Sequence, residues 1–379
     1  MKSNRIEYLD SLRGLASIAV VISHFVLAYR LDLEFKLINY SPLHFFFDGF
    51  AAVTFFFVLS GYVLTLSMKN KDEIIIGSFF IKRIFRIMPA YVVTLVVSLF
   101  FYSQFYSIQT SPDSSPWINS FWNKQLDFEG FFRQLFFFYP ENSAELMPQN
   151  WSLKTEMQFS FLIPFLFLIY KKLNFTFFAL LNLILYLFFS VPVFIFHFSL
   201  GICLAMNQEN ILKAFTSIKR DYKIMLISSI LLLYTYRFTL PMYYYYYMRE
   251  HSFLLNNDDL VWIITGFGSF FLLVYSLVST QVQKILNLRF LIFIGRISYG
   301  IYLTHLIVLI FLVPIFISQL NEIGIMNNYM IWLFSFSFLL ILTILLSYFL
   351  TMYVEIPMAK FGNFLIKKYG SRYNMIKTN

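Results

Sequence analysis

The sequence predicts an all-α fold, a polytopic membrane helical bundle of about ten transmembrane helices with both termini cytoplasmic. The first observation is composition: 59% of the 379 residues are hydrophobic and 13% are charged, against roughly 45–50% and 25% in a soluble domain. The second is that the apolar residues form long runs, and a bilayer-spanning helix needs about 20 of them. Because folding in water could not hide this much apolar surface, we exclude a disordered chain, a disulfide-stabilised secreted domain and an ordinary soluble enzyme.

Ten apolar runs give the expected spans in chain order. The uncharged stretch 173–208 is too long for one helix, and Pro192 near its middle favours a tight hairpin of two. The Phe-rich stretch 131–139 is too short to cross a bilayer and is expected at the interface. The expected spans are 9–29, 47–68, 87–106, 151–170, 173–190, 191–207, 222–240, 260–280, 297–318 and 330–353.

The charged residues predict the orientation of these spans. Lys and Arg gather at 69–86, 213–223 and 357–379, on the same side as the N-terminus, which the positive-inside rule assigns to the cytoplasm. Residues 357–379 are then a cytoplasmic basic tail, and 107–150 form an external loop, long enough to suggest a lid or binding role. We expect residues 1–379 to be a single transmembrane domain that carries any chemistry itself.

Other site classes find little support. Cys203 is the single cysteine, and the five histidines have no metal-ligand spacing, so neither a disulfide nor a metal site is expected. No nucleic-acid partner is expected, and the oligomeric state is left open.

Ionisable residues inside spans are costly and are functional candidates by default. Arg13 and His24 lie 11 residues apart in the first span, which places them on one helix face, about 16 Å apart along the axis. Arg83 and Arg86 also share a helix face and suit a phosphate, because their forked donors match its oxygens. Alternatively, Arg13 extends to the interface, His24 is an ordinary satisfied polar residue, and the arginine pair is a topology signal.

Later polar residues extend the candidate set. Glu156, at the outer start of the fourth span, could act as general acid or base, orient a histidine, or form a structural ion pair. Ser298, Tyr302 and His305 fall on one stripe of the ninth span, which predicts a cavity lining. Glu355 closes the last span at the inner face, where a salt bridge between helices is the favoured interpretation.

These motifs, taken in order, resemble the membrane acyltransferase-3 family, whose bacterial members O-acylate surface glycans. Arg13 and His24 match its Arg-x10-His motif, and Arg83 and Arg86 match its Arg-x-x-Arg motif. Further similar segments are Leu-Asp-Ser-Leu-Arg-Gly-Leu-Ala at 9–16, Phe-Phe-Phe-Val-Leu-Ser-Gly-Tyr at 55–62, Trp-Ser-Leu-x-x-Glu at 151–156, Ser-Tyr-x-x-Tyr-Leu-x-His at 298–305 and Glu-Ile-Pro at 355–357.

The resemblance implies an integral-membrane O-acyltransferase of the bacterial cytoplasmic (inner) membrane. It would move an acyl group, expected to be acetyl, from cytoplasmic acyl-CoA to a hydroxyl of a cell-surface or lipid-linked carbohydrate, with no bound cofactor. His24 would be the general base or carry the acyl group, with Glu156 as its catalytic partner. Arg13, Arg83 and Arg86 would bind the phosphates of CoA. Residues expected to line or support the cavity are Asp10, Ser298, Tyr302, His305 and Glu355.

Two other function classes compete with this interpretation. Intramembrane Arg, His and Glu residues also serve a transporter or flippase for a glycan or lipid-linked substrate, which performs no covalent chemistry. An accessory subunit derived from an enzyme is a third possibility, disfavoured because the matching Arg and His residues are retained. Transfer of label from acetyl-CoA to glycan would separate an enzyme from a transporter.

Overall fold

A computed structural model of the chain describes residues 6–29, 42–69, 73–105, 114–121, 128–137, 146–173, 177–178, 181–182, 184–186, 192–238, 258–325, 327–369 and 375–377. The chain forms two compact units. Unit 1 comprises Met1–Phe35, Phe80–Lys154 and Arg289–Arg372, and unit 2 comprises Lys36–Phe79, Thr155–Leu288 and Tyr373–Asn379.

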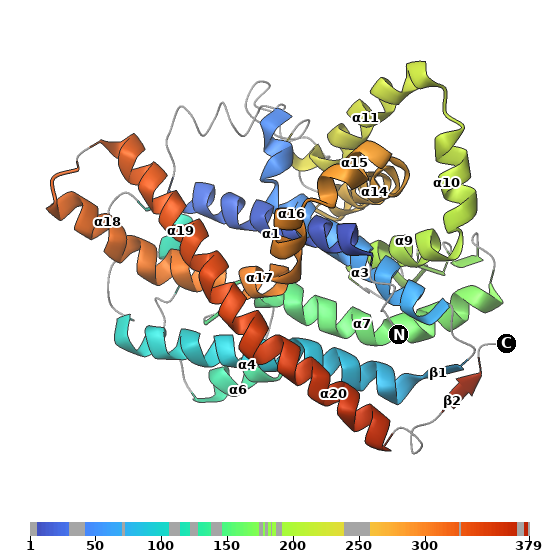
Figure 1. Ribbon diagram of the computed structural model, residues 1–379, viewed down its shortest axis with the longest axis horizontal. Helices are drawn as coiled ribbons and strands as arrows, with labels where there is room; N and C mark the ends of the chain where they lie inside the picture. The colour runs from blue at the N-terminus through green and yellow to red at the C-terminus, as the bar shows by residue number, and fades with distance from the viewer. Residues whose placement is uncertain are drawn as a thin grey trace. The chain divides into compact units, whose positions relative to one another are not determined.

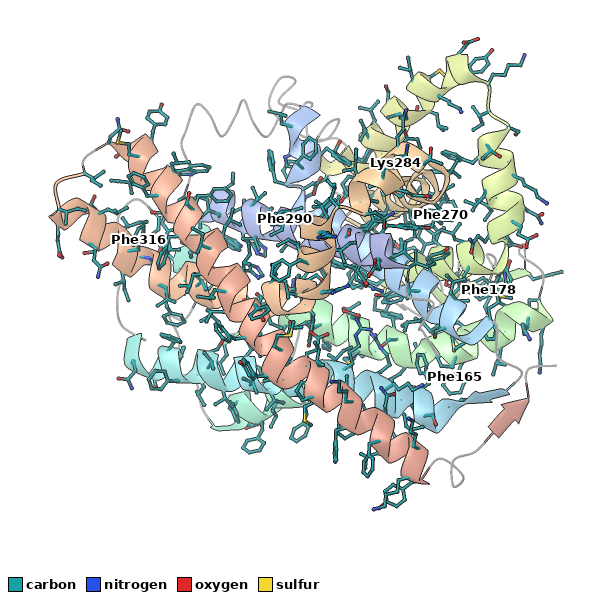
Figure 2. All side chains as sticks on the ribbon, in the orientation of Figure 1. Phe165, Phe178, Phe270, Lys284, Phe290 and Phe316 are labelled. Atoms are coloured by element: carbon teal, nitrogen blue, oxygen red, sulfur yellow. The ribbon has the colours of Figure 1, made fainter. Side chains whose placement is uncertain are left out.

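Unit 1 is built around the first helix, which packs against α5, α16 and α17, while α17 also packs against α19. Val21, Phe25 and Ala28 of this helix are fully buried, so its apolar face forms part of the core. Phe316 of α18, which Figure 2 labels, stacks on Phe338 of α19 with ring centroids 4.3 Å apart. The helices of unit 1 are α1 (Glu7–Ala28), most of α4 (Ile76–Phe105), α5 (Pro116–Asn119), α6 (Phe128–Leu135), the start of α7 (Asn150–Lys172), α16 (Arg289–Arg296), α17 (Ser298–Ile307), α18 (Val313–Glu322), α19 (Asn328–Leu350) and α20 (Ile356–Tyr369).

Two π-helical turns join the C-terminal helices into longer ones. The turn η3 (Val308–Leu312) links α17 to α18, and η4 (Thr351–Glu355) links α19 to α20. Figure 1 draws α19, η4 and α20 as one uninterrupted helix. Each turn ends two residues before a proline, Pro314 or Pro357. A proline lacks the N–H that an α-helix needs and its ring crowds the preceding turn, so a wider turn accommodates it.

Unit 2 is also helical, with one small exception. Helix α14 packs against α3, α9 and α11, and α3 lies along α9. The exception to the all-α prediction is a two-stranded antiparallel sheet in which Glu73 of β1 faces Lys377 of β2. The elements of unit 2 are η1 (Pro42–Phe46), α3 (Gly49–Lys69), β1 (Glu73–Ile75), the first turn of α4, the remainder of α7, α9 (Phe194–Met206), α10 (Gln208–Thr216), α11 (Arg220–Tyr234), α14 (Asp258–Val278), α15 (Thr280–Leu286) and β2 (Met375–Lys377).

Within the described residues, seven helices are long and apolar enough to cross a membrane. They coincide with seven of the ten expected spans and establish a multi-pass membrane protein. Of the others, 191–207 corresponds to the 13-residue α9 and 222–240 to the 15-residue α11, both shorter than the roughly 20 residues that a span needs. Most of 173–190 lies outside the described residues, so the count of ten and the cytoplasmic termini stay predictions. Residues 357–369, expected in the basic tail, belong to α20 and continue the last long helix. The long helices run Glu7–Ala28, Gly49–Lys69, Ile76–Gln104, Asn150–Lys172, Asp259–Val278, Ser298–Glu322 and Asn328–Tyr369.

Candidate active site

Two glycines bring α1 and α16 into backbone contact in unit 1. A Cβ atom on Gly295 would lie 2.3 Å from the carbonyl oxygen of Asp10, and one on Gly14 would lie 2.7 Å from the backbone nitrogen of Gly295. At this crossing Asp10 is buried, and its carboxylate pairs with the guanidinium of Arg13 at 3.1 Å. The polar residues of the 9–16 motif are therefore held at a close backbone crossing of two helices.

His24 lies further along α1 and meets His305 of α17. Nδ1 of His24 is 2.9 Å from Nε2 of His305, and Nδ1 of His305 is 3.1 Å from the carbonyl oxygen of Ile301. His305 is fully buried, whereas His24 is partly exposed. Two histidines that the sequence placed in separate motifs thus form one hydrogen-bonded pair.

Trp117 of α5 lies on the other side of His24. The indole and imidazole centroids are 5.2 Å apart, with the ring planes inclined by 27°. The backbone N–H of Ser115 donates to the carbonyl of Ala28 at 2.8 Å, which ties α5 to the end of α1. This part of the loop 107–150 therefore sits directly at the candidate catalytic residue, as a lid or binding loop would.

The predicted stripe of α17 is buried, and α7 holds it from one side. Ser298 and Tyr302 are both under 9% exposed, like His305. The hydroxyl groups of Tyr302 and Ser152 are hydrogen-bonded to each other. Nε2 of Gln149 donates to the carbonyl of Leu303 at 3.0 Å, so the turn that carries His305 is fixed to the start of α7.

A second series of hydrogen bonds begins at Asn150. Its Nδ2 donates to the hydroxyl of Tyr91 at 3.1 Å, and that hydroxyl donates to the carbonyl of Gln134 at 2.6 Å. Oε1 of Gln149 and Oδ1 of Asn150 are buried and accept no hydrogen bond within the described part of the chain. Buried acceptors of this kind call for an explanation, and a bound hydroxyl or water would supply one.

The two arginines of α4 occupy different environments despite their shared helix face. Arg83 is 7% exposed, whereas Arg86 is exposed. The hydroxyl of Tyr299 on α17 donates to the carbonyl of Ile87 at 2.9 Å. This bond connects the arginine-bearing part of α4 to the helix that carries His305.

The two candidate glutamates belong to different units, Glu156 to unit 2 and Glu355 to unit 1. Glu156 belongs to unit 2 and His24 to unit 1, so the role of Glu156 beside His24 stays a prediction. Glu355 lies in the π-turn η4, where its carboxylate accepts a 3.4 Å hydrogen bond from Thr351, one turn earlier. No group of three or more potential metal ligands occurs among the residues described.

Sequence reasoning found His24 and His305 separately but missed Trp117, Gln149 and Asn150. The last two directly precede the motif at 151–156, and two consecutive amides at the start of an apolar span could have marked them. Trp117 carried no such signal, because nothing in a loop sequence shows which helix it touches.

Comparison with known proteins identifies the family of the chain. A family model described as an acyltransferase domain matches residues 6–352, nearly the whole chain. No curated protein and no solved structure matches the chain. The match includes every motif residue from Asp10 to His305 and ends just before Glu355. The chain is therefore a member of the membrane acyltransferase-3 family, an integral-membrane acyltransferase.

Proposed function

We propose that this acyltransferase moves an acetyl group from cytoplasmic acetyl-CoA to a hydroxyl of a cell-surface or lipid-linked carbohydrate. The proposal includes a bacterial cytoplasmic membrane location with both termini inside. The observation that carries it is the hydrogen-bonded pair of His24 and His305 within a chain of this family. An imidazole held at a membrane-embedded site is suited to take a proton from a hydroxyl or to carry an acyl group.

The donor is assigned to the arginines. CoA carries several phosphates, and guanidinium groups bind phosphate through paired donors. In the proposal, Arg83 and Arg86 bind these phosphates from the cytoplasm, and Arg13, ion-paired with Asp10, helps to admit the pantetheine arm. His24 lies about 16 Å further along the same helix, a distance that the arm would span to bring the thioester to the imidazole.

In the proposed transfer, every proton and bond is accounted for without an external base. In direct transfer, His24 takes the proton of the acceptor hydroxyl while the oxygen attacks the thioester carbonyl. The C–S bond breaks, and His24 returns the proton to the departing thiolate. In the covalent alternative, His24 attacks the thioester first, and the acceptor hydroxyl then attacks the acyl-imidazole and passes its proton to the thiolate.

The remaining residues receive supporting roles. Glu156 is proposed to orient His24 or stabilise its charge when the imidazole is protonated. Ser298 and Tyr302 would line the cavity beside His305, and Glu355 would support the end of the last long helix. Gln149 and Asn150, whose carbonyl oxygens are buried acceptors, are suited to accept hydrogen bonds from a carbohydrate hydroxyl.

Label transfer tests the proposal against a transporter or flippase. Membranes that contain the protein are incubated with radiolabelled acetyl-CoA and a glycan extract of the source cells. We expect label in the glycan fraction with the wild type and with His251→Ala, a histidine variant outside every motif, but not with folded His24→Ala. Transfer by His24→Ala at the wild-type rate would refute the assignment of His24. Glycan movement without label transfer would favour the transporter.

A further inference from the structure

The hydrogen bonds around His24 determine which of its two ring nitrogens is basic. A neutral imidazole has one N–H and one lone pair, and the position of the proton decides which nitrogen can act as a base. The distances from the ring nitrogens of the histidine pair to their hydrogen-bond partners assign that proton.

The two imidazole rings meet edge to edge. Their planes are inclined by only 9°, and their centroids are 5.1 Å apart, while the bonded nitrogens are 2.9 Å apart. The centroid distance exceeds the nitrogen distance by about the two ring radii, so the centroids and bonded nitrogens lie almost on one line. Face-to-face stacking would bring the centroids closer. A hydrogen bond along this line is nearly straight, which is its strongest geometry.

The backbone sets the direction of this bond. Nδ1 of His305 lies 3.1 Å from the carbonyl oxygen of Ile301, and a carbonyl can only accept, so this Nδ1 carries the proton. In a neutral His305 the other nitrogen, Nε2, then has the lone pair. It must accept from His24, which places the proton of His24 on Nδ1 and the lone pair on Nε2.

A charged His305 would reverse the direction of the bond, and burial opposes it. With protons on both nitrogens, His305 would donate to His24 and move the proton of His24 to Nε2. His305 is fully buried, and an imidazolium in an apolar interior without a carboxylate partner is costly. Its two ring nitrogens face Nδ1 of His24 and a carbonyl oxygen, so no anion bonded to the ring offsets that cost.

We propose that His305 is a positioning residue that holds the proton of His24 on Nδ1 and leaves Nε2 of His24 as the reacting nitrogen. The inference rests on the proposed function, in which His24 is the base or acyl carrier. Nε2 of His24 makes no hydrogen bond within the described residues, and the His24 side chain is partly exposed. When Nε2 takes the hydroxyl proton or the acyl group, the positive charge that develops on His24 is shared through the Nδ1–H bond with Nε2 of His305.

Two variants of similar shape test the proposal by kinetics. His305→Gln retains a carbonyl oxygen that can accept from Nδ1 of His24, whereas His305→Met fills the same space without a strong acceptor. We expect His305→Met to lower kcat for acetyl transfer from radiolabelled acetyl-CoA by about 10²–10⁴-fold, the range for loss of acid–base function. KM for acetyl-CoA should stay unchanged. The kcat of His305→Gln should exceed that of His305→Met by at least about tenfold. Equal kcat in the wild type and a folded His305→Met protein would overturn the proposal.

Nitrogen NMR of protein labelled in histidine tests the proton position without an activity assay. The signals of His24 are identified by their loss in His24→Gln. We expect the proton of His24 on Nδ1 in the wild type, and a shift towards Nε2 in His305→Met. A wild-type proton on Nε2 would refute the inference even if His24→Ala is inactive and the proposed function stands. If His24→Ala is active, the proposed function fails, but the NMR result still shows which nitrogen of His24 carries the proton. If either His305 variant fails to fold, the wild-type spectrum alone still tests the position of the proton.

Discussion

Replacing Gly295 by alanine should destabilise the protein, although alanine is the better helix former. Alanine stabilises a helix interior by about 0.8–1.0 kcal/mol relative to glycine, so propensity alone predicts a gain. The added methyl group, however, would lie 2.3 Å from both the carbonyl carbon and the carbonyl oxygen of Asp10 and 2.7 Å from the nitrogen of Ser11. All three are backbone atoms, so no side-chain rotation relieves the contact.

The size of the overlap decides which effect is larger. Ordinary contact begins at 3.4 Å, so α1 and α16 must separate by about 1 Å at their crossing. Overpacking of this kind costs about 1–3 kcal/mol, and the separation also removes packing along both helices. The loss therefore exceeds the gain in propensity, and we expect a net destabilisation of roughly 1–2 kcal/mol.

Thermal unfolding in detergent measures the outcome. Gly295→Ala should unfold at a lower temperature than the wild type, and Gly14→Ala, which meets Gly295 from the opposite helix, should behave similarly. Leu15→Ala is the matched control, because Leu15 follows Gly14 on α1 and is 43% exposed. An unfolding temperature of Gly295→Ala at or above that of the wild type would refute the close crossing, since propensity would then be the only effect present.

Three further predictions concern the candidate site and its borders. Trp117→Ala should lower turnover by roughly two- to tenfold, because an aromatic contact is worth about 0.5–1.5 kcal/mol, and Trp117→Phe should restore most of it; equal rates would exclude a role for the ring. Arg296→Ala should change stability by less than about 1 kcal/mol, since its 3.0 Å ion pair with Glu7 is about half exposed; a larger loss would show a structural role. Arg83→Ala and Arg86→Ala should both raise KM for acetyl-CoA more than KM for the acceptor. Only the buried Arg83 should also lower the unfolding temperature, because exposed substitutions usually change stability by about 0.5 kcal/mol or less. Unchanged acetyl-CoA affinity in both variants would refute the phosphate assignment.

Hydropathy predicted the long spans because a bilayer imposes one simple requirement, a continuous apolar helix of sufficient length. Hydropathy does not give the bounds of a helix where the apolar sequence is not one continuous helix. The segment 191–207 has no charged residue, yet α9 begins only at Phe194, after Pro192. The segment 222–240 continues past Tyr234, where α11 ends. Hydropathy counts apolar residues but does not register where the backbone turns.

The motifs identified the family and most of the candidate residues, but not their partners. Helical periodicity put Arg13 and His24 on one face and placed His305 on its own stripe. It could not show that His24 and His305, 281 residues apart, are bonded to each other, because in lipid the choice of neighbouring helix depends on close packing and interhelical hydrogen bonds rather than on apolarity. Trp117 was missed for the same reason.

The close crossing at Gly14 and Gly295 bears directly on the histidine pair. α16 ends at Arg296, and α17 begins at Ser298, so any displacement of α16 from α1 is passed almost directly to the helix that carries His305. A displacement of about 1 Å would lengthen the 2.9 Å bond between the imidazoles beyond hydrogen-bonding distance. Misplacement on that scale can cost about 10²-fold in rate.

Gly295→Ala should therefore lose more activity than its stability explains. Measured well below its unfolding temperature, the folded variant should turn over far more slowly than Leu15→Ala, and the proton of His24 should no longer be fixed on Nδ1. If folded Gly295→Ala retains the wild-type rate, the crossing is a matter of packing alone. If the rate falls and the His24 proton shifts, Gly14 and Gly295 set the geometry of the base as well as the distance between two helices.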